Sequence, residues 1–307
     1  MKLYDCVIVG GGPAGLSAAI YLARFNRNVL VVDKKAGRSS FAEVNENYLG
    51  FPTGIPARKL RRLGKQQAER FGAEFTIDEV VSAKRIKSEF RVEGENDIYR
   101  GRTIIIATGV VDLFPEFEHY KEYVGKSLFW CITCDGYKTR NKRVVIIGKN
   151  DEAAVTCMQF LNFTKKLVFV TNCSQKECNV SEKRLTILQK AGIPIVYGQI
   201  TGVQGKNGMI KTVELDKGRA IPADFMFNQQ GAKPLSKVAR SLGVVCNGVG
   251  YVLIDEEQRT NVPFVYAAGD VTKAYSQQIV TAAYEGAAAG QRANYDLYTP
   301  EQREIEV

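Results

Sequence analysis

Six residues near the N-terminus constrain the fold more than any other stretch of the chain. The sequence GGGPAG at 10–15 follows a short apolar run, Cys6 to Val9, and precedes an apolar periodic segment that reaches Arg24. G-x-G-x-x-G between a strand and a helix is typical of a dinucleotide-binding βαβ unit. A second apolar run ends in Asp33, an acid placed to accept hydrogen bonds from a ribose. The stretch therefore predicts a Rossmann-like α/β fold.

Each position of the loop has a physical role. Gly10 permits the tight turn, Gly12 lets the backbone approach a pyrophosphate, and Gly15 lets helix and strand pack closely. Pro13 and Ala14 belong to the loop, and the helix that follows faces the phosphates with its positive N-terminal end. We therefore predict a bound dinucleotide at this loop.

A second constraint is a pair of cysteines near the middle of the chain. Cys131 and Cys134 are two residues apart and Asp135 follows them, so a small reducible disulfide can form beside an acid that handles the proton. Structural zinc is the rival interpretation, but zinc needs four ligands. The chain has no second C-x-x-C and one histidine, His119, so we predict no metal site. A buried pair of structural thiols remains the third alternative.

Composition is that of an ordinary globular enzyme. The 307 residues suffice for about two domains. No apolar run approaches the ~20 residues of a membrane helix, and no signal peptide is visible. We therefore predict a cytoplasmic protein without a membrane partner, in which a C-x-x-C is more often catalytic than structural. Of the other cysteines, Cys6, Cys157 and Cys246 are expected to pack, whereas Cys173 and Cys178 flank a polar loop.

The net charge of +9 is unevenly distributed. The excess of Lys and Arg lies in residues 116–240, because the two ends of the chain cancel each other. A basic module attracts nucleic acid or an acidic protein. The chain has no basic stripe interleaved with aromatic residues and no nucleic-acid motif, so we predict no nucleic-acid partner. An acidic protein partner and a generally solvated surface remain the alternatives.

Further motifs carry a family resemblance. The apolar run at 103–109 ends in Ala-Thr-Gly, the run at 260–270 ends in Gly-Asp, and ENYLGFP occupies 46–52. With the glycine loop and Cys-x-x-Cys-Asp-Gly, these motifs resemble the low-molecular-weight thioredoxin reductases over essentially the whole chain. The resemblance implies two Rossmann-like nucleotide-binding domains, the second inserted in the first. Its boundaries would give an FAD-binding domain at 1–115 and 235–307 and an inserted module at 116–234.

The resemblance also implies that the dinucleotide is FAD. In the family, the positions of Asn47 and Asp270 hold the flavin nucleotide, and Gln278 opens a helix whose N-terminus faces the isoalloxazine. The chain departs from the family where Gln277 replaces an arginine and where 34–40 lacks Gly-Gly-Gln. The residues expected to bind FAD are Gly10, Gly12, Pro13, Ala14, Gly15, Asp33, Lys34, Arg38, Ser39, Asn47, Thr108, Gly109, Gly269, Asp270, Gln277, Gln278 and Ile279.

The inserted module departs from the family at its nucleotide site. The family binds NADPH there through Gly-x-Gly-x-x-Ala and a later His-Arg-Arg run. This chain has Asn150 at the second glycine and Glu152 at the start of the helix, and the next strand, ending at Thr171, is followed by no arginine. We therefore expect NADPH use to be lost and the electron donor to be another carrier, such as an acidic ferredoxin.

The resemblance assigns roles around the cysteines. Cys134 would be the cysteine nearer the flavin, Cys131 would attack the disulfide of a thioredoxin-like protein, and Asp135 would be the acid/base. NADPH use through an altered site and a non-catalytic flavin redox sensor are the alternatives. The family is dimeric, so a homodimer is expected. Tyr295 and Tyr298 either fray with the terminus or form an aromatic lid on a flavin.

Overall fold

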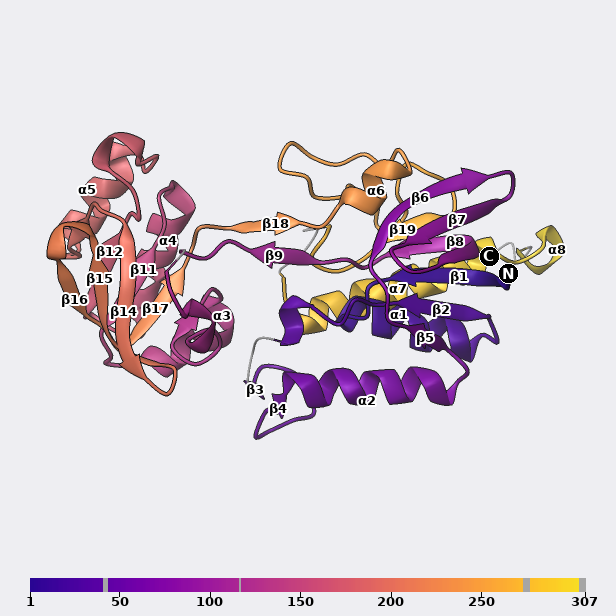
Figure 1. Cartoon of the computed structure of the whole chain (residues 1–307), viewed down its shortest axis with the longest axis horizontal. Helices are drawn as coiled ribbons and strands as arrows, with labels where there is room; N and C mark the ends of the chain where they lie inside the picture. Colours follow the sequence, from indigo (N-terminus) through magenta and orange to yellow (C-terminus); the bar gives the residue numbers. More distant parts are fainter. Residues whose placement is uncertain (41–43, 116, 273–276, 304–307) are drawn as a thin grey trace. The chain divides into compact units, whose positions relative to one another are not determined.

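The computed structural model describes residues 1–40, 44–115, 117–272 and 277–303. The chain divides into two compact units (Figure 1). Unit 1 comprises 1–40, 48–111 and 233–307, and unit 2 comprises 41–47 and 112–232. Each unit contains a sheet with parallel strands and flanking helices, which confirms the predicted α/β class.

The sheet of unit 1 is parallel around its glycine-loop strand. The strand order is β5-β2-β1-β8-β7-β6, with β19 also paired to β8. The pairs among β5, β2, β1, β8 and β19 are parallel, whereas β6 and β7 join β8 as an antiparallel hairpin. The strands are β1 (Leu3–Val9), β2 (Val29–Val32), β5 (Glu74–Thr76), β6 (Val80–Ile86), β7 (Glu89–Gly94), β8 (Ile98–Ile106) and β19 (Val265–Ala267).

One strand is shorter than its apolar run predicts. The sequence suggests a strand from Thr260, but β19 begins at Val265. Pro263 has no N–H for a sheet ladder, and Phe264 has a left-handed φ of 68°. Residues 260–264 therefore form an irregular entry to the strand.

The main helices of unit 1 pack unusually close. A Cβ on Gly286 of α7 (Ile279–Asp296) would lie 2.0 Å from the carbonyl oxygen of Ala14 in α1 (Pro13–Arg24). A Cβ on Gly290 would lie 3.0 Å from the carbonyl oxygen of Ala18. Small residues at this crossing thus let the two backbones meet. The other helices and short strands of unit 1 are α2 (Ala57–Arg70), α6 (Lys237–Ser241), α8 (Pro300–Arg303) and β4 (Ile55–Pro56).

Unit 2 repeats the parallel arrangement on a smaller scale. Its main sheet has the order β10-β17-β11-β12-β13, and a separate antiparallel sheet has the order β14-β15-β16. A core of buried aromatic and aliphatic side chains lies between the main sheet and its helices. The strands are β10 (Leu128–Phe129), β11 (Val144–Ile147), β12 (Leu167–Val170), β13 (Ile195–Val196), β14 (Ile200–Lys206), β15 (Met209–Leu215), β16 (Ala220–Pro222) and β17 (Phe225–Asn228); the helices are α3 (Ile132–Asp135), α4 (Asp151–Gln159) and α5 (Glu182–Lys190).

Two paired strands carry the chain out of unit 1 and back. β9 (Val110–Asp112) leads out, and β18 (Ala232–Pro234) returns beside it (Figure 1). Immediately beyond, the Leu113 amide donates to the carbonyl oxygen of Gly231 at 3.0 Å. Among the residues that the structure describes, no helix has the length and apolar character needed to cross a membrane.

The close crossing of α1 and α7 predicts that added side-chain volume at Gly286 destabilises the protein. Gly286→Ala should lower the free energy of unfolding by about 1–3 kcal/mol, because the added methyl meets backbone atoms that cannot rotate away. The measurement is urea unfolding at equilibrium. Gly64→Ala in α2 is the matched control: its Cβ would meet only the end of the Leu16 side chain, at 3.1 Å, and should cost less. Equal losses for both variants would contradict the packing argument.

Candidate functional site

The glycine loop lies at the carboxyl ends of the parallel strands of unit 1. Gly10 has a φ of 110°, and a Cβ there would lie 2.4 Å from the carbonyl oxygen of Ala107. A Cβ on Gly15 would lie 1.9 Å from the carbonyl oxygen of Gly10. Gly12 differs, since no described atom lies within 4 Å of the place its Cβ would occupy. Two glycines are thus required by packing, and the third leaves backbone open to a ligand.

The N-terminus of α1 is open in the same way. Its N-cap is Gly12, and the structure shows no side-chain cap hydrogen bond there; Pro13 is the first helical residue. The helix N–H groups and the positive end of the dipole are therefore available to an anion. Ala14 is buried between Gly269 and Gly286, so it contributes its small size rather than a contact to a ligand.

An ion pair between an aspartate and an arginine lies next to the glycine loop. Asp33 follows β2, and its carboxylate forms an ion pair of 3.0 Å with Arg61 of α2. Arg61 also donates to the carbonyl oxygen of Gly11 at 3.4 Å. Sequence reasoning missed Arg61, because nothing in the basic sequence of α2 distinguishes it from its neighbours. Lys34 forms its ion pair with Glu79 instead, at 2.8 Å.

A second polar cluster surrounds the turn after β19. Arg38 donates to Asp270 at 3.2 Å and to the side-chain oxygen of Gln277 at 2.9 Å. Burial raises the pKa of Asp270, and the Arg38 guanidinium opposes that rise. Position 277 is an uncharged glutamine in this chain, in place of the arginine that the resemblance leads us to expect. The cation beside Asp270 is therefore Arg38. Ser39 lies in the same one-turn segment as Arg38.

Glu285 holds this turn from the middle of α7. Its buried carboxylate accepts hydrogen bonds from the Gly269 amide at 2.6 Å and from the Thr272 hydroxyl at 3.0 Å. Burial raises the pKa of Glu285, and these two donors oppose the rise. Sequence reasoning missed this residue too, although an acid among the small and apolar residues of 279–290 was a visible signal.

The remaining residues that the sequence predicts to bind FAD are divided between the two units. The Thr108 hydroxyl donates to the carbonyl oxygen of Leu235 at 2.7 Å, and Gly109 has a left-handed φ of 69°. Gln278 is the N-cap of α7, which begins at Ile279. Asn47 belongs by its contacts to unit 2, where its side chain is exposed.

The C-terminal tyrosines lie far from the glycine loop. The 18 residues of α7 span about 27 Å, and Tyr298 follows their far end. Arg27, which precedes β2, stacks over the Tyr298 ring at 5.2 Å, and Arg292 lies over the Tyr295 ring at 4.8 Å. These tyrosines thus lie at the end of α7 opposite Gln278, and a lid formed by them over a flavin, of this chain or of a partner subunit, stays a prediction.

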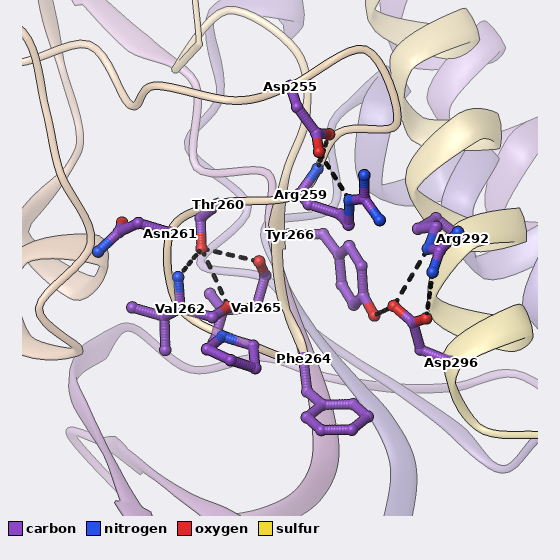
Figure 2. Close-up of a pocket in the computed structure, with 11 residues that line it drawn as sticks. Asp255, Arg259, Thr260, Asn261, Val262, Phe264, Val265, Tyr266, Arg292 and Asp296 are labelled. Carbon is purple, nitrogen blue, oxygen red and sulfur yellow. Dashed lines mark hydrogen bonds and ion pairs between the residues drawn. The ribbon is translucent and has the colours of Figure 1, made fainter.

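A pocket of about 320 Å³ lies near this end of α7 (Figure 2). Its charged side chains pair with one another: Arg259 binds Asp255 at 2.6 Å and Arg292 binds Asp296 at 2.6 Å. The buried Tyr266 hydroxyl also donates to Asp296. Since each charge already has its partner, the pocket is held by a structural network and is a poor candidate for chemistry.

In unit 2, the cysteine pair forms the predicted disulfide. Cys131 and Cys134 are bonded, with their Cα atoms 5.3 Å apart. Cys131 is the N-cap of α3, and the Cys134 amide donates to its sulfur at 3.0 Å. An amide donor at this position favours negative charge on the sulfur once the disulfide is reduced. Within the described part of the chain, no cluster of His, Cys, Asp and Glu could hold a metal ion.

A lysine lies directly on the acid beside the disulfide. Lys138 forms an ion pair of 2.8 Å with Asp135 and lies 3.5 Å from Glu46. The Tyr137 hydroxyl also donates to Glu46. Burial raises the pKa of Asp135, Lys138 lowers it, and the charge of Glu46 raises it. The protonation of Asp135 is thus set by burial and by the two charged neighbours together.

The N-terminus of α4 contrasts with that of α1. Its N-cap is Asn150, whose side-chain oxygen accepts a hydrogen bond from the Ala153 amide at 3.0 Å. Asp151 and Glu152 place two carboxylates in the first turn. This helix end is therefore satisfied by the chain itself and carries negative charge where a phosphate would need donors.

Residues 179–181 form hydrogen bonds with the loop that precedes α4. The Asn179 amide donates to the carbonyl oxygen of Lys149 at 2.8 Å. The Ser181 amide and hydroxyl donate to Asp151 at 2.7 and 2.9 Å. These bonds tie residues 179–181 to the start of α4.

The other cysteines are free thiols. Cys6 and Cys157 are buried, and burial raises the pKa of each to about 12. Cys173 is buried and its pKa is raised by burial, whereas Cys178 and Cys246 are partly exposed. The raised pKa values of Cys6, Cys157 and Cys173 disfavour a thiolate at these three positions.

Comparison with known proteins agrees with these features. Residues 4–286 match the family model for pyridine nucleotide-disulphide oxidoreductases. The chain is 30% identical to a thioredoxin reductase of Treponema pallidum, covering 94% of this chain and 96% of that one, and 31% identical to one of Listeria monocytogenes, covering 95% and 93%. The crystal structure of thioredoxin reductase from Streptococcus pyogenes is similar with a TM-score of 0.89 and 25% identity, covering 96% of this chain and 98% of that one. The chain therefore belongs to the low-molecular-weight thioredoxin reductase family of pyridine nucleotide-disulphide oxidoreductases.

Proposed function

We propose that the protein is an FAD-dependent enzyme that passes two electrons through Cys131–Cys134 to a thioredoxin-like protein, and that its electron donor is a carrier other than NADPH, such as ferredoxin. The contrast between two helix N-termini carries this proposal. α1 is open at Gly12, whereas α4 is capped by Asn150 and bears two acids. The first suits a dinucleotide and the second does not.

The residues of unit 1 fit FAD. The open backbone at Gly12 and the N–H groups of α1 would receive the pyrophosphate, and Asp33 would accept from the ribose. Asp270, held by Arg38 and by the Glu285-bound turn, would accept from ribityl hydroxyls. When bound, FAD supplies the two electrons that reduce the cysteine pair.

The cysteines then perform a thiol–disulfide exchange. The Cys131 thiolate attacks one sulfur of the substrate disulfide, which breaks that bond and releases a substrate thiolate. The Cys134 thiolate next attacks the Cys131 sulfur, which restores the enzyme disulfide and releases the second substrate thiolate. Two electrons leave the enzyme, and two protons follow them to the substrate.

Asp135 moves the protons. As a carboxylate, it takes a proton from a cysteine thiol and returns it to a leaving thiolate. The ion pair with Lys138 favours that carboxylate against the effect of burial. Lys138 therefore belongs to the machinery of the exchange through its effect on Asp135.

The partners and the setting complete the proposal. The substrate is a thioredoxin-like protein, as the names of the matching relatives suggest. An acidic donor such as ferredoxin suits the net charge of +9. We also propose that the enzyme is a cytoplasmic homodimer, in line with the family it resembles.

The cysteine roles predict a trapped intermediate. Cys134→Ser should accumulate a stable mixed disulfide with oxidised thioredoxin, because Cys131 attacks but nothing resolves the product. Cys131→Ser should form none. Both variants should lose turnover. Non-reducing electrophoresis with mass spectrometry reads out the adduct, and an adduct that forms only in the Cys131→Ser variant would reverse the assignment.

The Lys138–Asp135 pair predicts a shift in pH dependence. Lys138→Met removes the cation that lowers the pKa of Asp135, so that pKa should rise further. The carboxylate is then lost at higher pH, and the acid limb of the rate of thioredoxin reduction by pre-reduced enzyme should move to higher pH. Lys138→Arg should restore the profile of the natural protein. An unchanged acid limb in Lys138→Met would remove Lys138 from the mechanism.

The α4 terminus predicts poor use of NADPH. Mixed anaerobically with the oxidised enzyme, excess NADPH should bleach the flavin more slowly than photoreduced ferredoxin does. Two lost contacts to phosphate charge are worth about 3 kcal/mol, so NADPH should bind about a hundredfold more weakly than at a site that keeps both contacts. Asn150→Gly is the matched variant: it frees the Ala153 amide and should speed the reaction with NADPH. Rapid bleaching of the natural protein by NADPH would contradict the donor proposal.

A further inference from the structure

Unit 2 presents a group of exposed cations that outnumber the acids beside them. Two turns lie side by side, one before β11 and one before β12. The Asn141 amide donates to the carbonyl oxygen of Phe163 at 3.1 Å, and the Thr164 hydroxyl donates to that of Lys142 at 2.7 Å. These bonds fix the two turns to each other and bring their charges together.

We call the four exposed cations of these turns the cation patch: Arg140, Lys142, Lys165 and Lys166. Residues 136–150 and 153–176 contain no Asp or Glu. Within the described part of the chain, none of the four forms an ion pair, whereas the nearby Arg143 binds Asp224 at 2.7 Å. Asp224 also lies near Lys142, whose charge helps to lower the pKa of that carboxyl, so one acid faces this group of cations. The patch therefore keeps a net positive charge, which draws an acidic partner.

The patch adjoins the redox helix within the same unit. Gly136 directly follows Asp135, and a Cβ there would lie 2.9 Å from the ring of Phe163. The turn that carries Lys165 and Lys166 thus packs against the end of the Cys131–Cys134 segment. A protein interface of about 800 Å² per partner is roughly 30 Å across. A protein whose disulfide reaches Cys131 would cover the patch as well.

We propose that the cation patch is the electrostatic docking surface for an acidic, thioredoxin-like substrate that exchanges with Cys131–Cys134. This inference rests on the proposed function and adds the surface and the charge of the partner. The substrate is chosen over the electron donor because the patch and the cysteine pair share one unit, and because Phe163, two residues before Lys165, packs against Gly136, two residues after Cys134. Steering by such a field raises the association rate and weakens as salt is added.

The test uses the full-length enzyme, photochemically reduced and free of oxygen, so that no donor is needed. It is mixed rapidly with an oxidised thioredoxin of net negative charge, at about 0.01 M and about 0.5 M ionic strength. The double variant Lys142→Glu, Lys165→Glu should lower the second-order rate constant about tenfold or more at low salt. At high salt the variant and the natural protein should converge.

Two controls separate docking from chemistry. The double variant Lys206→Glu, Lys211→Glu makes the same charge change at exposed positions of the antiparallel β14–β15 sheet, and should keep the full rate constant. The neutral small disulfide 2-hydroxyethyl disulfide should react equally fast with all three proteins, because it needs no docking. Matched thermal unfolding shows that the variants are folded.

The outcomes are distinct. If the natural protein reduces the small disulfide but no thioredoxin, the proposed function itself fails. If it reduces thioredoxin and the patch variant does so equally fast at low salt, the docking proposal alone is overturned. The docking proposal is also overturned if the patch variant slows flavin reduction by ferredoxin while leaving thioredoxin reduction unchanged, since the patch then serves the donor.

Discussion

The contact of α1 with α7 is the constraint on which the rest of unit 1 depends. Because Gly286 brings the α7 backbone against Ala14, the start of α1 and the middle of α7 lie at one place. Glu285, next to that contact, then reaches the Gly269 amide and fixes the turn that presents Asp270. A helix crossing made of small residues thereby aligns the glycine loop and the acid turn, which are more than 250 residues apart in the chain.

The two units show how one topology diverges in its chemistry. Both place a strand, a tight loop and a helix in succession, and both keep the first glycine: a Cβ on Gly148 would lie 2.3 Å from the Cβ of Ala153. The difference is one side chain at the N-cap. Glycine leaves α1 with donors to offer, whereas Asn150 uses one of the donors of α4 for the stability of its own helix. The proposed loss of NADPH use would thus follow from a change at the helix end, with the strand–loop–helix fold retained.

Sequence reasoning succeeded where a motif acts through the local backbone. The α/β class, the glycine loop, the disulfide and the helix opened by Gln278 depend on spacing within a few residues. It failed where side chains meet across long separations, because no local pattern marks Arg61 on Asp33 or Arg38 on Asp270. It also left the place of the tyrosines open, since spacing in the sequence does not tell at which end of an 18-residue helix a ligand lies.

The pairing of β9 with β18 has a consequence for how the chain is assembled. The crossings at β9 and β18 run together, and Leu113 and Gly231 are joined by a backbone hydrogen bond of 3.0 Å. The ends left by excising everything between them therefore already lie within reach of a short linker. Residues 114–230, which make up most of unit 2, could in this sense be exchanged as a cassette without rerouting the parallel sheet of unit 1.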